Sequence, residues 1–514
     1  KKGRLEISNS RSVDWAGNIN GAFNKLTENN SLISMIIGAE IRKNRSENSS
    51  LKAAGFYDDA LNFIGHATGY PTDSKNKPSG NQDLSTEVGF FANANYMYNN
   101  RYYADFVYRL SGSSKFGSNQ RYGQFWSGGL GWNLHNENFL KFEKLNLLKI
   151  RGSVGYTGKV NFEPFQSITM YKYENTLEYL HGIGAIPQTI GNDDLKWERE
   201  FSYNIGADIS LFDRRLNATL DFYLKRTKDL VLDASIAPST GVVSGKQNIG
   251  EMENKGFEFS VDGFIIQRND VWWQLGMNGS TNKNRILKIS NALKRQNELN
   301  NDVAPTRQTP APLAQYEEGE STSALKVVRS AGIDPATGRE VFIKLDGTRT
   351  FTYSADDKVV VGDTDPRFYG NVYTNVFYKG FSLYIMGSFK CGGYLYNVTR
   401  ASRVEGTTGR TNVDRRAFDS RWKEVGDIAL YRNITEHSVP QQTDRFVEKE
   451  NVLTITSVNL GYEFPQRICQ KMMLRNLRLG VNLSDILRFS NVKVERGLDY
   501  LYGNGFEFTL STTF

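Results

Sequence analysis

The side chains that could catalyse a reaction or hold a metal ion are few and dispersed in this 514-residue chain. None of the four histidines has metal-ligand spacing, and each falls in an expected loop or at an expected strand end. The sequence also holds no GxSxG elbow, Walker loop or HExxH helix. We therefore expect a protein that is not an enzyme and that has no cofactor or metal site. The histidines are His66, His135, His181 and His437.

Two pairs of neighbouring carboxylates, Asp193-Asp194 and Asp356-Asp357, have the residue type of a glycosidase site. Such a site needs its two carboxyl groups a few ångströms apart across a cleft, which a sequence cannot show. Residues 334–339 and 346–348 could suggest calcium loops, but they lack the dense carboxylates and the closing glutamate of such loops. We interpret these segments as turns.

A more informative set of charged side chains stands in the middle of alternating segments. Asp105 and Arg109 lie between apolar residues at every second position from 102 to 110. Successive side chains of a strand point to opposite faces, so one face here is apolar and the other is charged. A wide transmembrane barrel offers such charges a hydrated lumen. The candidates for the lumen are Asp105, Arg109, Arg151, Asp208, Asp221, Lys225 and Glu258.

The same two-residue alternation recurs along the whole chain, in segments of about ten residues. A soluble sandwich also alternates, but its strands are typically shorter, and a tilted strand needs about 9–11 residues to cross a bilayer. Aromatic residues make up 12% of the chain, as interfacial girdles require. We therefore predict an all-β protein, a transmembrane antiparallel β-barrel. The expected strands are 12–25, 31–43, 85–98, 101–112, 122–134, 145–157, 198–212, 214–228, 255–267, 271–283, 368–378, 381–390, 452–464, 476–485 and 505–514.

The connections between these strands alternate between tight turns and long excursions, as periplasmic turns and extracellular loops do. The architecture does not change along residues 1–514, so we expect a single barrel portion. Residues 1–8 resemble the end of one more strand. A barrel must close, because an open edge in hydrocarbon leaves unpaired backbone groups. We therefore expect further strands and an N-terminal portion outside this sequence.

Composition excludes several other classes. No apolar stretch is long enough for a helical span, and the mean hydropathy is −0.49, which a barrel tolerates because its strands alternate. Cys391 and Cys469 are far apart and are expected to be free. The net charge of +7 is scattered, which gives no support for nucleic-acid binding. Basic loops could contact anionic lipopolysaccharide, although solvated loops explain them equally simply.

Aromatic side chains in or beside the long excursions are candidates for stacking on sugar rings or packing against peptides. An interfacial girdle or loop packing explains them at least as well. These candidates are Trp126, Tyr171, Tyr173, Tyr316, Tyr369, Tyr394 and Tyr396. At the C-terminus, Phe508, Leu510 and Phe514 share one face of the last strand. They fit the aromatic end that outer-membrane insertion machinery reads, or they simply face lipid.

Several passages resemble the barrel of SusC/RagA-type TonB-dependent outer-membrane transporters of Bacteroidota. They are SKFG at 114–117, LKIRGSVGYTG at 148–158, LKWE at 195–198 and VVGDTDPRFYG at 360–370. The resemblance implies about 15–16 strands of a 22-stranded barrel, with the plug absent from this chain. It also implies location in the bacterial outer membrane and contact with outer-membrane lipids.

The resemblance further implies an active importer of oligosaccharides or oligopeptides, energised by the TonB complex through a plug region and capped by a SusD-like lipoprotein. The charged lumen residues would then contact the plug, which we favour, or the cargo. A passive porin is the alternative, and a glycan-processing enzyme on a β scaffold is a third possibility that lacks a catalytic constellation. Glycan and peptide cargo remain equally open.

Overall fold

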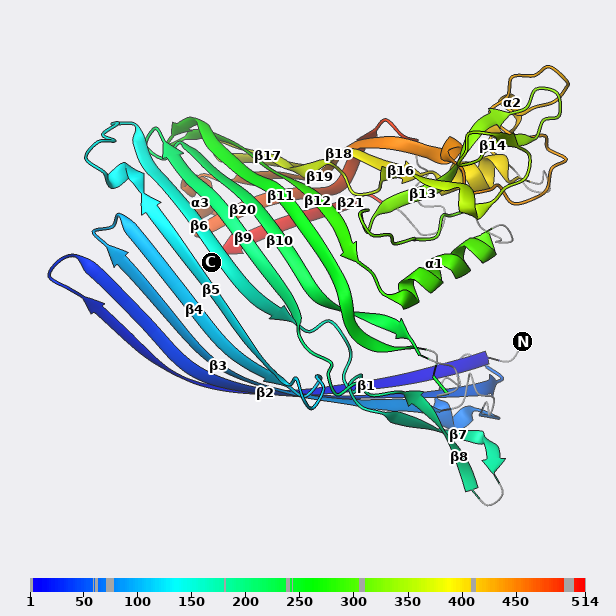
Figure 1. The fold of residues 1–514 in the computed structure, drawn as a ribbon. Coiled ribbons are helices and arrows are strands. Elements are labelled where there is room, and N and C mark those ends of the chain that lie inside the picture. The colour runs from blue at the N-terminus through cyan, green and yellow to red at the C-terminus, as the bar shows by residue number, and fades with distance from the viewer. Residues whose placement is uncertain are drawn as a thin grey trace. The chain divides into compact units, whose positions relative to one another are not determined.

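Fifteen strands form one antiparallel sheet in the computed structural model, as the alternation predicts (Figure 1). The structure describes residues 3–58, 60, 63–70, 78–179, 182–236, 241–242, 244–304, 310–407, 413–493 and 503–513, without the side chains of 174–179 and 182–183. The hydrogen-bonded order follows the chain, except that strands of the long excursions stand outside the sheet. The strands in order are β1 (Gly3–Leu26), β2 (Ser31–Phe56), β3 (Ser79–Tyr98), β4 (Tyr102–Ser113), β5 (Tyr122–Asn133), β6 (Leu145–Lys159), β9 (Glu198–Leu211), β10 (Leu216–Ser235), β11 (Ser244–Arg268), β12 (Val271–Lys288), β17 (Phe368–Tyr378), β18 (Phe381–Tyr396), β19 (Val447–Glu463), β20 (Asn476–Ser490) and β21 (Gly505–Thr513).

The prediction of a separate strand remnant at residues 1–8 is wrong. Residues 3–8 belong to β1, which pairs with β2 from Leu26↔Leu32 back to Gly3↔Phe56. The error arose because residues 8–12 are polar on both faces, so the alternation that marks a strand is interrupted there. At 24 residues, β1 is more than twice the length that a tilted strand needs to cross a bilayer.

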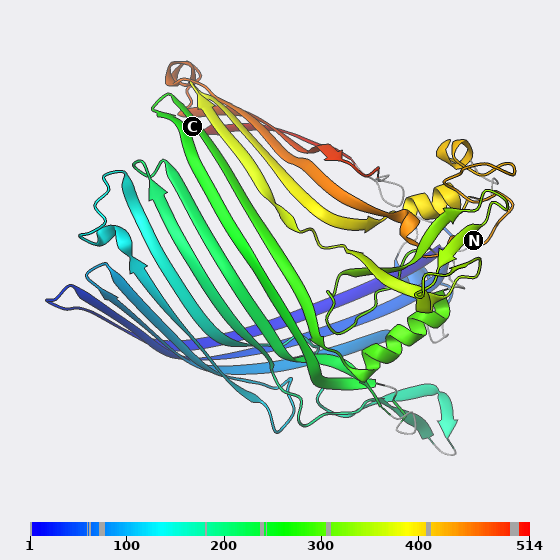
Figure 2. The same ribbon diagram turned by 45° about the horizontal axis from the view of Figure 1, so that its top comes forward.

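By density of contacts the chain divides into two units. The first holds 1–130, 154–201 and 228–249, and the second holds the remainder. In the first unit β1, β2 and β3 run side by side, as Figures 1 and 2 both show, and the hairpin of β7 (Met170–Tyr179) and β8 (Gly182–Thr189) stands outside the sheet.

A small core in the first unit joins two of the passages that resemble the transporter family. The ring of Phe116 lies 4.3 Å from that of Trp197, and the Gly117 N–H donates to the Leu195 carbonyl. A Cβ on Gly117 would lie 2.1 Å from the Asp193 carbonyl oxygen, so only glycine fits this close approach. The passages at 114–117 and 195–198 therefore hold two loops together through this ring contact and this backbone hydrogen bond.

The second unit carries a smaller sheet in its long excursions. Its strand order is β15-β14-β13-β16, and its core is built from Leu325, Val327 and Phe446, with Tyr396 and Ala401. Sequence reasoning treated 284–367 and 391–451 as loops and missed these elements. They are α1 (Asn291–Val303), β13 (Ala324–Ile333), β14 (Glu340–Ile343), β15 (Arg349–Thr350), β16 (Lys358–Asp363), the π-helical turn η6 (Arg400–Glu405) and α2 (Arg416–Asp419). Outside these excursions, the short helix α3 (Gln466–Lys471) follows β19.

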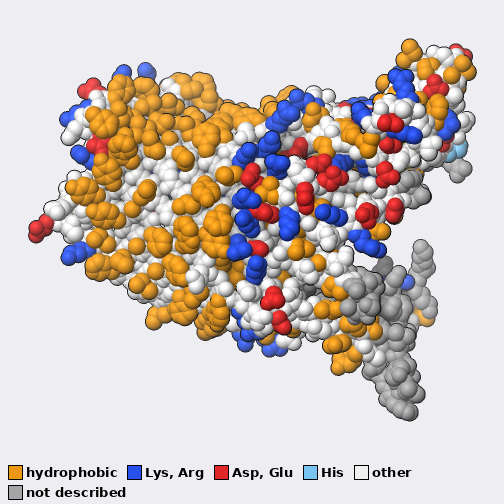
Figure 3. All heavy atoms as spheres, in the orientation of Figure 1, with side chains coloured by type: hydrophobic (Ala, Val, Ile, Leu, Met, Phe, Trp, Pro, Cys, Tyr) orange, Lys and Arg blue, Asp and Glu red, His pale blue; other side chains and the backbone are white. Residues whose placement is uncertain are grey.

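The outward face of β10 to β12 changes character along the strands. On β10, Leu216, Phe222 and Leu224 are exposed, and Arg226 follows at the next position of the same face. Figure 3 shows the same change over these strands, from apolar side chains to a zone rich in Lys, Arg, Asp and Glu. Such a border is expected where a strand leaves hydrocarbon for water.

Candidate functional site

The polar face of the second unit gathers three of the predicted lumen residues into one cluster. Arg151 on β6 lies between two carboxylates, with Nε 3.2 Å from Asp208 Oδ2 and Nη2 2.6 Å from Asp221 Oδ2. All three side chains are partly buried. Asp208 on β9 and Asp221 on β10 thus share the guanidinium of Arg151. The two ion pairs hold β6, β9 and β10 together near the middle of the strands.

Beside this cluster the same polar face has a hollow of about 380 Å³. Asp221 and Glu258 contribute carboxylates, Asn278 and Asn371 contribute amides, and Tyr369 contributes a phenol ring. The Asn371 side-chain N–H donates to Asn278 Oδ1 at 3.3 Å, which orients both amides. The hollow therefore offers donors, acceptors and a flat ring, which can bind sugar hydroxyls or peptide amides. Its other lining residues are Thr219, Phe259, Ser260, Gly279, Ser280 and Gly370.

Tyr369, which the sequence suggested as a loop aromatic, is the second residue of β17 and lies on this polar face. The amides of Asn278 and Asn371 were missed by sequence reasoning. A signal is present in the sequence, because both asparagines stand on the polar face of predicted strands, but a search for charged residues alone does not find them.

In the first unit Arg109 forms an ion pair with Glu40 on β2, and its Nε donates to Ser111 Oγ at 2.7 Å. Asp105 shares this face of β4 and lies against Gly129. The residue that sequence reasoning missed here is Glu40, whose segment reads as a strand with few charges. Lys225 of β10, in the second unit, lies over the ring of Tyr223, at 5.2 Å.

The remaining aromatic candidates are divided between the two units. Tyr171 and Tyr173 are exposed on β7, and Trp126 shares a face of β5 with the highly exposed Leu130. Tyr316 is half-buried, and Tyr394 packs against the core of the small sheet. Tyr396 is 6% exposed inside that core, so its proposed contact with cargo is corrected: burial of the ring against Phe446 leaves no face for a ligand.

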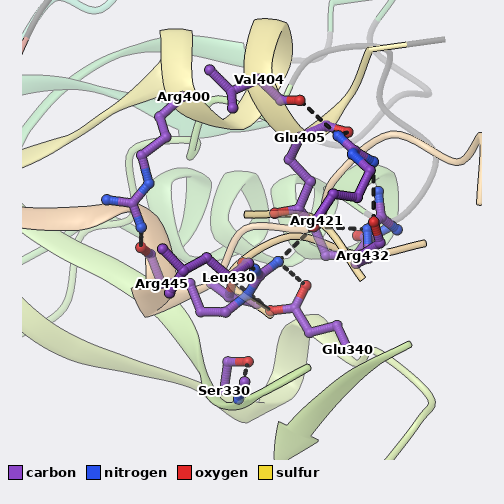
Figure 4. A network of polar contacts seen from close by, with 12 residues as sticks. Ser330, Glu340, Arg400, Val404, Glu405, Arg421, Leu430, Arg432 and Arg445 are labelled. Atoms are coloured by element: carbon purple, nitrogen blue, oxygen red, sulfur yellow. Dashed lines mark hydrogen bonds and ion pairs between the residues drawn. The ribbon is translucent and has the colours of Figure 1, made fainter. Parts of the chain in front are cut away.

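A buried charge network anchors the excursion between β18 and β19 to the small sheet (Figure 4). Arg445 donates to Glu340 through Nε at 2.7 Å and Nη2 at 2.8 Å, and to Glu405 at 2.7 Å. Arg432 Nε also donates to Glu405, at 2.8 Å. Burial opposes the charge of Arg445, but the two carboxylates more than offset it and raise its pKa. The network acts as a rigid brace for this excursion.

Arg421 completes the brace through backbone contacts. Its guanidinium donates to the carbonyls of Ala417, Val404, Glu405 and Arg432 at 2.7–3.1 Å. Burial lowers the pKa of Arg421. Four carbonyls that a loop would otherwise leave buried without donors are satisfied by this single side chain.

The two pairs of neighbouring carboxylates, Asp193-Asp194 and Asp356-Asp357, lie in loops, where they accept hydrogen bonds. Asp193 and Asp194 accept from the side chains of Ser118 and Asn119 at 2.9 and 3.0 Å, and Asp357 accepts from the Leu345 N–H. The residues at 334–338 and 346–348 form turns closed by Asp334 and Asp346, as predicted.

Three further sequence predictions can be placed. Cys391 and Cys469 are free, as expected. Phe508 and Leu510 are 81% and 65% exposed on one face of β21, while Phe514 lies outside the described residues. In the part of the chain that the structure describes, no three His, Cys, Asp or Glu side chains gather as metal ligands, and no helix is long and apolar enough to span a membrane.

The sequence is similar to a known protein family and to several characterised relatives. A family model described as "TonB dependent receptor-like, beta-barrel" matches residues 4–482. TonB-dependent receptor P3 of Formosa agariphila is 28% identical over 491 residues, and TonB-dependent receptor SusC of Bacteroides thetaiotaomicron is 35% identical over 214 residues. These alignments cover 91% and 40% of this chain, and 48% and 21% of the two relatives.

Among solved structures, the RagAB peptide transporter is similar in fold, with a TM-score of 0.83 at 23% identity over 96% of this chain and 53% of that chain. The outer membrane transporter YddB from Escherichia coli has a TM-score of 0.50 at 11% identity, over 98% of this chain and 54% of that one. This chain thus spans about half the length of the proteins it matches.

Proposed function

Because this chain belongs to the TonB-dependent receptor-like β-barrel family, we propose that it is the barrel portion of an active outer-membrane importer of oligosaccharides or oligopeptides. Family membership confirms the predicted transmembrane β-barrel and the location in the outer membrane. The proposal assigns all of residues 1–514 to the barrel.

The observation that carries the proposal is the polar face of the barrel strands. Charged and amide side chains stand in mid-strand, where the opposite face of the same strands is apolar. A charge at mid-strand is tolerated when it faces water rather than lipid, so this face lines the hydrated interior. The hollow beside Glu258 and Tyr369 is then a contact point for cargo or for the plug.

The relatives support a proposal for the energy source and the partner. SusC and RagAB support a transporter that draws energy through a TonB complex and works with a SusD-like lipoprotein at the cell surface. The excursion between β18 and β19, which is held by the network around Glu405, is the surface that we propose such a lipoprotein contacts. The name of the RagAB peptide transporter supports peptides, and the hydrogen-bonding hollow suits glycans equally well.

The proposal is tested by deleting the gene and measuring uptake of labelled oligosaccharide and oligopeptide pools. We expect uptake of at least one pool to fall and to return when the full-length gene is restored. Unchanged uptake of every candidate glycan and peptide would refute the proposal.

A further inference from the structure

Two lysines stand directly opposite each other on the outward face of neighbouring strands. Lys255 on β11 is the register partner of Lys283 on β12, and both side chains are exposed. Like charges in directly opposed positions destabilise a sheet. Within the described residues, neither ammonium group takes part in an ion pair that would offset this repulsion. An arrangement of this kind is stabilised when an anion binds between the two charges.

The surroundings of the pair add positive charge. Arg285 is exposed two residues beyond Lys283 on the same face, opposite the half-buried Glu253. Two further carboxylates in this region already have cationic partners, because Glu251 binds Arg226 at 2.6 Å and Glu320 binds Lys326 at 2.7 Å. On β11 and β12, the cations Lys255, Lys283 and Arg285 therefore face Glu253 as the one carboxylate without a described cationic partner. In the wall of the neighbouring hollow, Asp363 and Asp365 are accompanied by a fourth cation, Arg367.

A row of aromatic rings lies next to the pair on the same outward face. Phe257 and Phe259 occupy the two positions that follow Lys255 on this face, about 7 Å apart along the strand. Ring centroids lie 4.6 Å apart for Phe222 and Phe257, 6.0 Å for Phe259 and Phe368, and 5.0 Å for Phe368 and Phe389. Such rows of aromatic rings mark the membrane interface.

We propose that Lys255, Lys283 and Arg285 form a binding site for the phosphate groups of an anionic glycolipid in the outer leaflet. The aromatic row places these cations at headgroup height, and Figure 3 shows Lys and Arg side chains along the border of the apolar zone over β10 to β12. A lipid held here keeps its acyl chains on the apolar part of the strands while its phosphate lies between the two lysines.

A hollow beside the cations provides room for the sugar headgroup. It measures about 980 Å³, and its wall includes Lys255, Lys283, Arg285 and Arg367 together with the ring of Tyr394. Asp363 and Asp365 lie in the same wall, so the hollow combines cations with acceptors for hydroxyl groups. A simple phosphate ion would leave most of this volume unused, which favours a glycolipid over a free anion.

The test uses the full-length protein purified from outer membranes and inserted into nanodiscs of zwitterionic lipid. Binding of diphosphoryl lipid A is measured by native mass spectrometry for the parent protein and for Lys255→Gln/Lys283→Gln. Each cation near a membrane surface contributes about fivefold to affinity, so the double variant should bind roughly 25-fold more weakly. The matched control is Arg268→Gln/Lys379→Gln, which removes two exposed cations at the tight-turn ends of the strands and should bind like the parent.

Heat-modifiable migration on gels confirms that each variant is folded. The proposal is supported when the parent prefers diphosphoryl over dephosphorylated lipid and only the Lys255→Gln/Lys283→Gln protein loses that preference. Equal lipid binding by parent and double variant would overturn it. Competition by millimolar inorganic phosphate that displaces the lipid completely would also overturn it, because the site would then be one for a free anion.

Discussion

At the residue scale, Arg151 shows how one side chain can make a charged strand face compatible with a stable sheet. It forms ion pairs with Asp208 and Asp221 on two neighbouring strands at once. Without it, two carboxylates would face each other in a partly buried place, where repulsion is screened less than at the surface. The cluster thus stabilises the sheet and also contributes to the charge of its polar face.

We predict that Arg151→Gln lowers the stability of the folded protein by about 1–3 kcal/mol, because two carboxylates lose their shared cation. The measurement is the temperature at which heat-modifiable migration on gels is lost. The triple variant Arg151→Gln/Asp208→Asn/Asp221→Asn removes the repulsion and should recover most of that loss. Equal stability of the parent and Arg151→Gln would show that the cluster does not support the wall.

A second residue-scale prediction concerns Asp444, outside the membrane-spanning part. Burial raises the pKa of its carboxyl group, and the Ser330 N–H partly offsets this. A folded-state pKa above the unfolded value means that stability falls as pH rises through the folded pKa. Asp444→Asn keeps the acceptor for Ser330 and removes the charge, so it should slow backbone hydrogen exchange of β13 at neutral pH. The difference from the parent should shrink as the pH is lowered, and a difference that grows on acidification would contradict this account.

At the element scale, the excursion between β18 and β19 is held by buried charges as well as by two small apolar clusters, one around Phe446 and one formed by Val404, Ala417 and Tyr431. Glu405 is 1% exposed and accepts from both Arg432 and Arg445. Removing one partner of a buried network leaves an uncompensated charge, which is far more costly than breaking a surface pair.

We predict that Glu405→Ala destabilises this excursion by about 3–5 kcal/mol, because Arg432 and Arg445 lose a shared carboxylate. Limited proteolysis of intact cells should then cut within 397–446 while the barrel strands stay protected. Glu424→Ala, which removes an exposed glutamate from the same excursion, should leave the cleavage pattern as in the parent. Identical protection of Glu405→Ala and the parent would show that the brace is dispensable.

Element by element, the sequence was informative where one face of a strand is consistently apolar. The segment from Phe201 to Leu211 alternates without interruption, and β9 lies there. All fifteen strands of the large sheet were predicted, but the extension of several strands was not; on β1, for example, residues 8–12 are polar on both faces. The small sheet around Val327 was missed because three of its four strands, β14, β15 and β16, are short, and because its core forms only when Tyr396 and Phe446, distant in sequence, meet.

At the scale of the whole molecule, the proposed import depends on the polar face. Glu258→Ala and Asn371→Ala remove hydrogen-bonding groups from the hollow while leaving the Arg151 cluster intact. Each is expected to lower cargo uptake by about tenfold, which corresponds to the loss of one or two hydrogen bonds. Uptake of labelled cargo by cells with matched surface expression checks this, with Glu28→Gln in the exposed turn after β1 as the control. Normal uptake by both variants would assign the hollow to the plug or to water.

The most direct test of the central claim is whether cargo accumulates against its gradient. Cells that express the full-length protein are given labelled cargo at low concentration, and the periplasmic concentration is measured with and without a proton uncoupler. Active import predicts a periplasmic concentration above the external one, which collapses when the uncoupler is added. A periplasmic concentration that only equals the external one and ignores the uncoupler would contradict active import and identify a passive pore.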